Sequence, residues 1–112
     1  TLTPLEVAVS YDSGLYAAAK IIEMGADGVV TGADIIAAGL VDGLQRLGKS
    51  IPDEVAVMGY DNLPICQHVR PRLSTIDQGL REKVKAVVDL VEEPRPGTVR
   101  IVDPTRIERE SA

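Results

Sequence analysis

Short runs of aliphatic and β-branched residues alternate with helix-length amphipathic stretches in the first half of the chain, and few folds accommodate that order. Strand-like runs occupy residues 6–10, 28–31 and 55–60, and helix-like stretches occupy residues 12–24 and 35–47. The runs at 28–31 and 55–60 lack polar alternation, which is typical of strands covered on both faces. The order of elements predicts an α/β fold in which a parallel sheet is flanked by helices.

The second half predicts shorter elements. A loop or short helix at 62–69 is followed by an expected strand at 73–76 and an amphipathic helix at 80–91. Two further short strands are expected at 98–102 and 105–108. The apolar stripe that should face inward from the helix consists of Leu80, Val84, Val87, Val88 and Val91.

Glycine, serine and aspartate mark the expected helix ends. Asp12 or Ser13 should cap the first helix and Gly25 should end it, while Asp34 and Gly48 should bound the second. The stripes expected to face the core are Leu15, Ala18, Ala19 and Ile22 in the first helix and Ile36, Leu40, Leu44 and Leu47 in the second.

Composition excludes several classes of function. The 112 residues carry a formal net charge of −5, and Lys and Arg are not clustered, so the chain is not expected to bind nucleic acid by itself. The single cysteine, Cys66, cannot form an intramolecular disulfide, which suits a reducing compartment. The sequence shows neither a membrane-spanning stretch nor a secretory signal. We therefore expect a cytoplasmic location and no membrane contact.

Neither catalysis nor a cofactor is expected. His68 has only Cys66 nearby as a metal-ligating partner, which is too few for a zinc site, and it accompanies no nucleophile motif. The glycines at 28–32 lack the third glycine of a dinucleotide fingerprint. The sequence thus predicts no enzyme, no metal and no cofactor.

In sheets of this kind, ligands bind beyond the carboxyl ends of the strands. Residues 10–12, 31–34 and 60–62 hold those positions. Asp61 is the foremost candidate, because an ionised carboxylate accepts two hydrogen bonds at once. The alternative is a turn aspartate that bonds its own backbone, since Asp-Asn pairs commonly begin turns.

Five ordered segments, at 11–18, 30–39, 51–62, 71–78 and 104–111, together resemble the C-terminal part of the lactose/galactose-repressor (LacI/GalR) family of bacterial transcription regulators. The resemblance covers nearly the whole chain and preserves the spacing. It implies most of the C-terminal lobe of a periplasmic-binding-protein-like (type I) core, incomplete because one strand of that lobe and nearly all of the other lobe are missing.

The resemblance also implies a division of the chain. Residues 1–78 would form the effector-binding lobe without its first strand, residues 79–97 a helix and turn that cross to the other lobe, and residues 98–112 a closing strand segment and the C-terminus. The helix at 80–91 would then lack its partner lobe. We therefore expect it to exchange between chains, to fold back on its own sheet, or to meet the remainder of a longer protein.

The function implied by the resemblance is effector sensing in a dimeric regulator. A sugar or purine-like small molecule would bind in the cleft between two lobes, and DNA would be bound only through a helix-turn-helix segment that this chain lacks. The ligand-binding residues implied are Asp61, Val9, Val30, Ala33 and Gln78. Ala33 departs from the asparagine that many members have there, so one hydroxyl contact would be lost. The dimer-interface residues implied are Ala38, Val41, Ile65 and Val69.

Two other classes fit part of the pattern. A lobe of a periplasmic sugar-binding protein would share the fold. A phosphorylatable receiver domain would use Asp61 as its phospho-acceptor, but it needs an acidic pair after the first strand and a lysine after the last. Residues 10–12 supply one acid only, and Asp77-Gln78 supplies no lysine.

Overall fold

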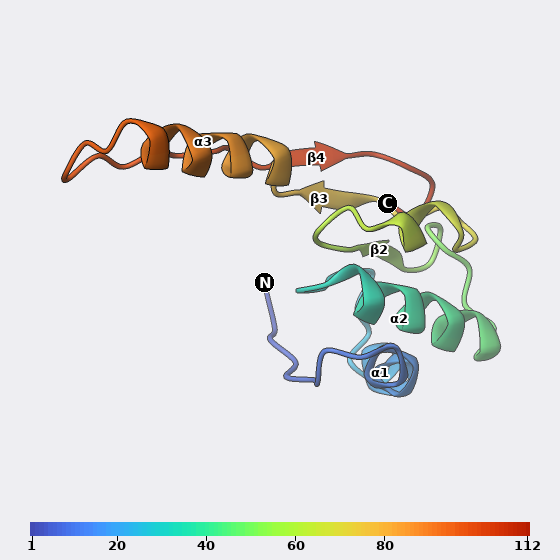
Figure 1. The fold of residues 1–112 in the computed structure, drawn as a ribbon. Helices are drawn as coiled ribbons and strands as arrows, with labels where there is room; N and C mark the ends of the chain where they lie inside the picture. Colours follow the sequence, from blue (N-terminus) through green and yellow to red (C-terminus); the bar gives the residue numbers. More distant parts are fainter.

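The computed structural model describes residues 1–112, and its elements follow the expected order from the first helix onward (Figure 1). They are α1 (Tyr11–Glu23), β1 (Gly28–Val30), α2 (Asp34–Arg46), β2 (Ala56–Met58), the 3-10 helix η1 (Pro64–Gln67), β3 (Thr75–Asp77), α3 (Leu80–Glu92) and β4 (Thr105–Ile107). The strands expected at 6–10 and 98–102 do not form, because the backbone there makes no ladder hydrogen bonds with another segment. β-branched residues alone therefore did not suffice to make a strand.

Two pairs of strands are joined into one surface. β1 and β2 pair in parallel, with Val29 opposite Val57, and β3 and β4 pair antiparallel, with Ile76 opposite Arg106. A single parallel bridge between Met58 and Ser74 links the pairs. β1 has one partner strand and its Val30 is exposed. The expectation that this strand is buried on both faces is therefore wrong.

The last residues of the chain hold the two pairs together. The buried Ser111 hydroxyl donates to the Val57 carbonyl (2.6 Å) and accepts from the Ser74 amide (2.8 Å). The Val57 amide donates in turn to the Ser111 carbonyl (2.8 Å). The C-terminal segment therefore lies between β2 and β3 and fixes their spacing.

Helices α1 and α2 approach each other backbone to backbone. A Cβ added at Gly14 would collide with the Ile36 carbonyl, and one added at Gly39 would collide with the Tyr11 carbonyl. Gly43 is similarly close to Leu15 of α1. The close approach that glycine permits on α2 is thus made to α1 of the same chain.

The caps of α1 agree only in part with expectation. Ser10, rather than Asp12 or Ser13, caps the helix by accepting from the Ser13 amide (3.1 Å), and Gly25 follows its end at a φ of +68°. The face turned to the core is shifted from the expected stripe, because the glycine contacts with α2 set the helix rotation. The buried residues are Gly14, Ala18 and Ile21, whereas Leu15 and Ile22 are half-buried and Ala19 is exposed.

Helix α2 is the centre of the core. Ile36, Leu40 and Leu44 are buried as expected, but Leu47 is exposed at the helix end. Its N-cap position is held by Ala33, without a side-chain bond, so Asp34 is not the expected cap. The ten buried residues of the core cluster come from α1, α2, β2, η1 and the neighbouring loops: Ala18, Ile21, Ala37, Leu40, Val41, Leu44, Val55, Val57, Cys66 and Leu73.

Two of the expected interface residues lie in this interior. Ala38 and Val41 are each 1% exposed, because α2 packs between α1 and the strands. They are therefore not available to a second copy of the chain, which corrects that part of the interface expectation. Ile65 and Val69 are half-buried, and Val69 packs against the core.

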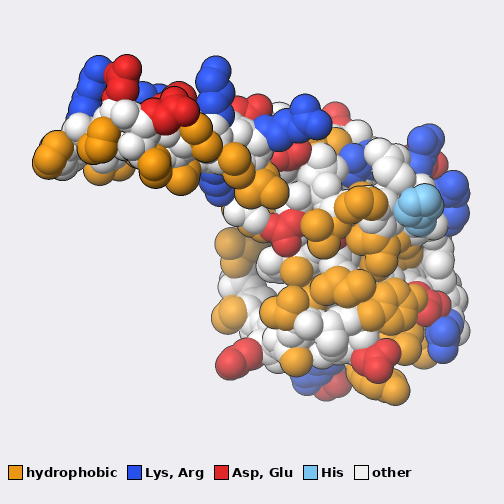
Figure 2. All heavy atoms as spheres, in the orientation of Figure 1, with side chains coloured by type: hydrophobic (Ala, Val, Ile, Leu, Met, Phe, Trp, Pro, Cys, Tyr) orange, Lys and Arg blue, Asp and Glu red, His pale blue; other side chains and the backbone are white.

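Helix α3 projects from the body as an arm (Figure 1). It has no buried residue, and its stripe of Leu80, Val84, Val87, Val88 and Val91 is 46–72% exposed. Figure 2 shows apolar side chains along one side of the arm and charged side chains along the other. The helix has formed as expected, but it does not fold back on its own sheet.

The arm gives the chain an elongated outline, with extents of 55 × 26 × 23 Å. No helix combines the length and the hydropathy needed to cross a bilayer.

Candidate ligand site at the carboxyl ends of the strands

A strained turn follows β2. Asp61 has a φ of +117° and Asn62 a φ of +58°, and these are the only two residues other than glycine with positive φ. Asparagine and aspartate tolerate such values better than other side chains, yet conformations of this kind cost about 1–3 kcal/mol each and concentrate at functional sites. Hydrogen bonds from the Asp61 amide to the Ile76 carbonyl (2.8 Å) and from the Asn62 amide to the Thr75 hydroxyl (3.3 Å) hold the turn against β3.

The buried carboxylate of Asp34 supports the other side of this turn. Its Oδ2 accepts from the Leu63 amide (2.7 Å) and its Oδ1 accepts from the Thr75 hydroxyl (2.5 Å). The Asp34 amide donates to the Tyr60 carbonyl (2.9 Å). Residues 31–34 and 60–62, expected at neighbouring strand ends, are thereby brought together.

The side chain of Asn62 is fixed at both ends. Its Oδ1 accepts from Nη2 of Arg109 (2.8 Å), and its Nδ2 donates to Oδ2 of Asp77 (2.9 Å). The other oxygen of Asp77 accepts from the Gly79 amide (2.7 Å). Hydrogen bonds from the Asn62 carboxamide and then from the Gly79 amide lower the pKa of Asp77.

Asp61 and Gln78 lie together, as their shared assignment to the ligand site requires. Nε2 of Gln78 donates to Oδ1 of Asp61, and Oε1 of Gln78 accepts from Nζ of Lys83 (3.2 Å). Asp61 and Gln78 are both half-buried. The pair therefore presents a carboxylate and an amide at the point where the chain leaves β3 for α3.

The other residues expected to bind the ligand lie at different distances from the Asp61 turn. Ala33 is buried beside Asp34, next to the turn, whereas Val30 lies exposed at the end of β1. Val9 is 75% exposed in the segment before α1, and residues 10–12 contact α2 near Gly39 rather than the turn. Asp61, Gln78 and Ala33 thus form a neighbourhood, which Val30 borders and Val9 does not reach.

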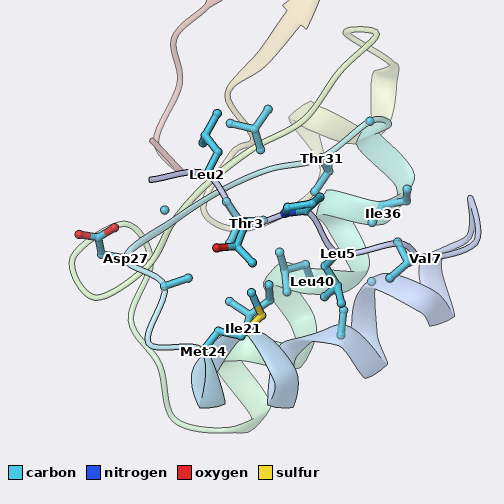
Figure 3. Close-up of a pocket in the computed structure, with 18 of the residues that line it drawn as sticks. Leu2, Thr3, Leu5, Val7, Ile21, Met24, Asp27, Thr31, Ile36 and Leu40 are labelled. Carbon is cyan, nitrogen blue, oxygen red and sulfur yellow. The ribbon is translucent and has the colours of Figure 1, made fainter.

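A separate cavity lies away from this turn. About 540 Å³ is enclosed between residues 1–7, α1, α2 and the unpaired edge of β1 (Figure 3). Apolar side chains such as Leu5, Ile36 and Leu40 share its walls with the polar side chains of Thr3, Asp27 and Thr31, and it includes neither Asp61 nor Gln78. A hydroxyl-rich ligand needs polar partners, and the carboxylate of Asp61 beside the amide of Gln78 makes the turn the better candidate site.

Cys66 and His68, which the sequence did not favour as reactive or metal-binding residues, lie in different surroundings. Burial, reinforced by Asp34, raises the pKa of the Cys66 thiol to about 12, so the thiol is protonated and unreactive at neutral pH. His68 is exposed, and no group of three or more metal-ligating side chains is gathered in the structure.

Sequence reasoning missed the residues that support the turn. Arg109, Asn62 and Thr75 were not assigned a role, and Asp34 was expected to cap a helix. Arg109 and Asn62 are 47 residues apart, and no local pattern signals a contact at that separation. The dipeptide Asp61-Asn62 was the one available signal, since both residue types favour positive φ.

Comparison with known proteins identifies the chain's relatives. The family described as "periplasmic binding protein-like domain" matches residues 3–112. The ribose operon repressor of Halalkalibacterium halodurans is 27% identical over 72% of this chain and 26% of its own length. The regulator CelR of Thermobifida fusca is 27% identical over 88% of this chain and 31% of its own length. The chain therefore spans about a quarter to a third of these curated relatives.

Solved structures agree with this assignment. A LacI family regulator from Enterococcus faecium with bound ribose aligns at a TM-score of 0.80 and 30% identity, covering 96% of this chain and 42% of that one. A LacI family regulator from Arthrobacter sp. FB24 in complex with lactose aligns at 0.84 and 27% identity, covering 94% and 42%. The chain belongs to the periplasmic binding protein-like domain family, and the solved structures that it resembles are LacI family transcriptional regulators.

Proposed function

We propose that this chain supplies one wall of the effector site of a LacI-type regulator, and that the effector is a hydroxyl-rich small molecule, a sugar in the first instance. The observation that carries the proposal is the Asp61 carboxylate, held on a strained turn at the carboxyl end of β2 and joined by Gln78 at the exit from β3. The sugars named with related structures, ribose, lactose and cellobiose, support this class of ligand. A purine-like effector is the second candidate within the same site.

The chemistry of the pair suits a polyol. Gln78 occupies Oδ1 of Asp61, which leaves Oδ2 to accept from a ligand hydroxyl. Ala33 contributes no polar atom beside the turn, so hydroxyl recognition on this wall depends on Asp61 and Gln78. Val30 at the end of β1 offers an aliphatic surface to the less polar face of a sugar ring.

The second wall of the site would come from the other lobe. Residues 1–78 would form one lobe, residues 79–97 would lead toward the other lobe, and residues 98–112 would return from it. Effector binding would change the angle between the lobes, and it would alter DNA binding only if the effector binds the two arrangements unequally. The proposal includes dimer formation, DNA contact through a separate segment and a cytoplasmic location, and the relatives' names as transcriptional regulators support the DNA contact.

Fewer residues remain candidates for the dimer interface than the resemblance implied. Ile65 and Val69, in and after η1, remain candidates because they are half-buried in the isolated chain. Ala38 and Val41 are excluded because they pack inside the chain.

The test is effector binding by the complete gene product. Calorimetry with ribose, lactose, cellobiose and a purine base should find one ligand that binds, and Asp61→Asn should weaken it. Loss of a charge-assisted hydrogen bond is worth about 1.5–3 kcal/mol, or roughly ten- to hundredfold in Kd. Asparagine also tolerates positive φ, so the turn should survive the change.

Asp53→Asn is the matched control, because Asp53 lies exposed in the connector before β2. It should leave the Kd unchanged. Equal affinities for the Asp61→Asn variant and the unaltered protein would refute the assignment of Asp61.

A further inference from the structure

The Asn62 carboxamide can take only one orientation. Its oxygen faces the guanidinium of Arg109 and its nitrogen faces the carboxylate of Asp77. Rotating the amide by half a turn would set N–H groups against the guanidinium donors and an oxygen against a carboxylate. The two partners together therefore fix both the rotation and the position of this side chain.

Arg109 is itself anchored to the strands. Its Nη1 donates to the Leu73 carbonyl (2.8 Å), and its backbone amide donates to the Ser74 hydroxyl (2.8 Å). Both contacts lie just before β3, and Arg109 is half-buried. The planar guanidinium bridges the Leu73 carbonyl and the Asn62 carboxamide. It therefore holds the turn at a fixed distance from the start of β3.

The position of Asn62 governs that of Asp61. The two residues are adjacent and share the left-handed turn, which the backbone would leave if nothing held it. Asp77, the second partner of Asn62, directly precedes Gln78, which bonds Asp61. The same contacts thus hold the Asp61 carboxylate and the amide that faces it.

We propose that Arg109 is a positioning residue for the effector site: through the Asn62 carboxamide it holds the strained turn that directs the Asp61 carboxylate. The effect on ligand binding rests on the proposed function, whereas the effect on the turn does not. The two are therefore measured separately.

The first readout needs no ligand. In the complete gene product, NMR chemical shifts of the Asp61 amide and of the Gln78 side-chain amide report the turn and its contact. Arg109→Met, which removes the donors but keeps the stem, should displace both signals. Arg106→Met is the matched control, because Arg106 lies on β4 and its side chain forms an ion pair only with Glu108 at the surface; it should displace neither.

The second readout is the Kd for ribose, or for lactose or cellobiose if ribose does not bind. Arg109→Met should raise it about tenfold, and Arg106→Met should leave it within a factor of two. If none of the three sugars binds while Arg109→Met still displaces the two signals, the sugar assignment fails and the positioning role stands. Unchanged signals in Arg109→Met overturn the positioning role, whatever the sugars do.

Repeating Arg109→Met in an Asn62→Gly variant shows whether Arg109 acts through the Asn62 side chain or only stabilises the fold in general. Asn62→Gly removes the carboxamide and accepts positive φ without help, so Arg109→Met should have little added effect on the signals or on the Kd in that background. An equal effect in both backgrounds would show that the Arg109 side chain acts only through the Leu73 carbonyl, and would overturn the proposal. If Arg109→Met does not fold, Asn62→Ala provides the test: it should displace the Asp61 signal, and an unchanged signal would overturn the proposal.

Discussion

Asp34 shows how one carboxylate can set the start of a helix against two strands. It lies fully buried in the first turn of α2, where the helix dipole favours a negative charge. Both of its oxygens accept from groups on other elements, the Leu63 amide after β2 and the Thr75 hydroxyl of β3. Its burial is tolerable because those bonds replace the water it has lost.

Removing this carboxylate should destabilise the fold. Asp34→Ala would leave the buried Thr75 hydroxyl without an acceptor, at about 1–3 kcal/mol, and would remove the bond from the half-exposed Leu63 amide, so the free energy of unfolding should fall by about 2–4 kcal/mol. Urea denaturation measures the loss. Asp53→Ala, at an exposed carboxylate with no side-chain bond, should change it by less than about 0.5 kcal/mol; similar losses for the two variants would contradict this account of Asp34.

The carboxyl group of Asp77 should titrate at a lower pH than an ordinary aspartate. Bonds from the Asn62 carboxamide and the Gly79 amide favour its charged form and lower its pKa. Because the folded pKa lies below the unfolded value of about 3.9, the stabilisation is complete above that value and is lost as pH falls through the folded pKa. Carboxyl NMR titration should show the Asp77 midpoint move upward in Asn62→Ala, and equal midpoints in the two proteins would contradict the bond.

At the scale of elements, the packing of α1 on α2 depends on glycines, which have no side chain. Gly14, Gly39 and Gly43 let the two backbones meet more closely than any Cβ permits. This contact sets the rotation of α1 and turns Gly14, Ala18 and Ile21 inward. The helix face at the core thus follows from glycine positions rather than from the most apolar stripe.

Gly39→Ala should therefore be poorly tolerated. Its Cβ would meet the Tyr11 carbonyl, a backbone group that cannot move aside, and overpacking of this kind costs about 3 kcal/mol or more. Thermal unfolding should show a Tm lower by roughly 10 °C or more. Gly32→Ala is the control, because a Cβ there meets open space; a Tm as low in the control would contradict the packing argument.

Helix positions could be predicted from the sequence because their signals are local. Gly25 and Gly48 end the helices at positive φ, as a glycine after a helix commonly does. Strands depend instead on a partner, so residues 6–10 carry the composition of a strand without forming one. The support of the Asp61 turn was beyond prediction for the same reason, since Asp34, Asn62 and Arg109 act across separations of 29 to 47 residues.

The whole molecule consists of a packed body and an arm. Its radius of gyration of 16.7 Å exceeds the roughly 13 Å expected for a compact domain of this length. The difference comes from α3, whose apolar stripe has no partner within the chain. The strands that lead to and from the arm, β3 and β4, carry Asp77 and precede Arg109, the two residues that hold Asn62. The proposed effector wall and the connection to the arm are therefore built on the same contacts.

This arrangement predicts that the 112-residue chain alone binds sugar far more weakly than the complete gene product. Binding sites commonly cover 70–90% or more of a ligand's surface, and Asp61, Gln78 and Ala33 offer contacts from one side only. Calorimetry on the two proteins, with the sugar that binds the complete one, should give at least a hundredfold difference in Kd. NMR spectra that show a folded body in the short chain are the necessary control, because an unfolded chain would also fail to bind. Equal affinities would mean that the lobe described here holds the sugar without a second wall, and that closure of two lobes is not what makes the site.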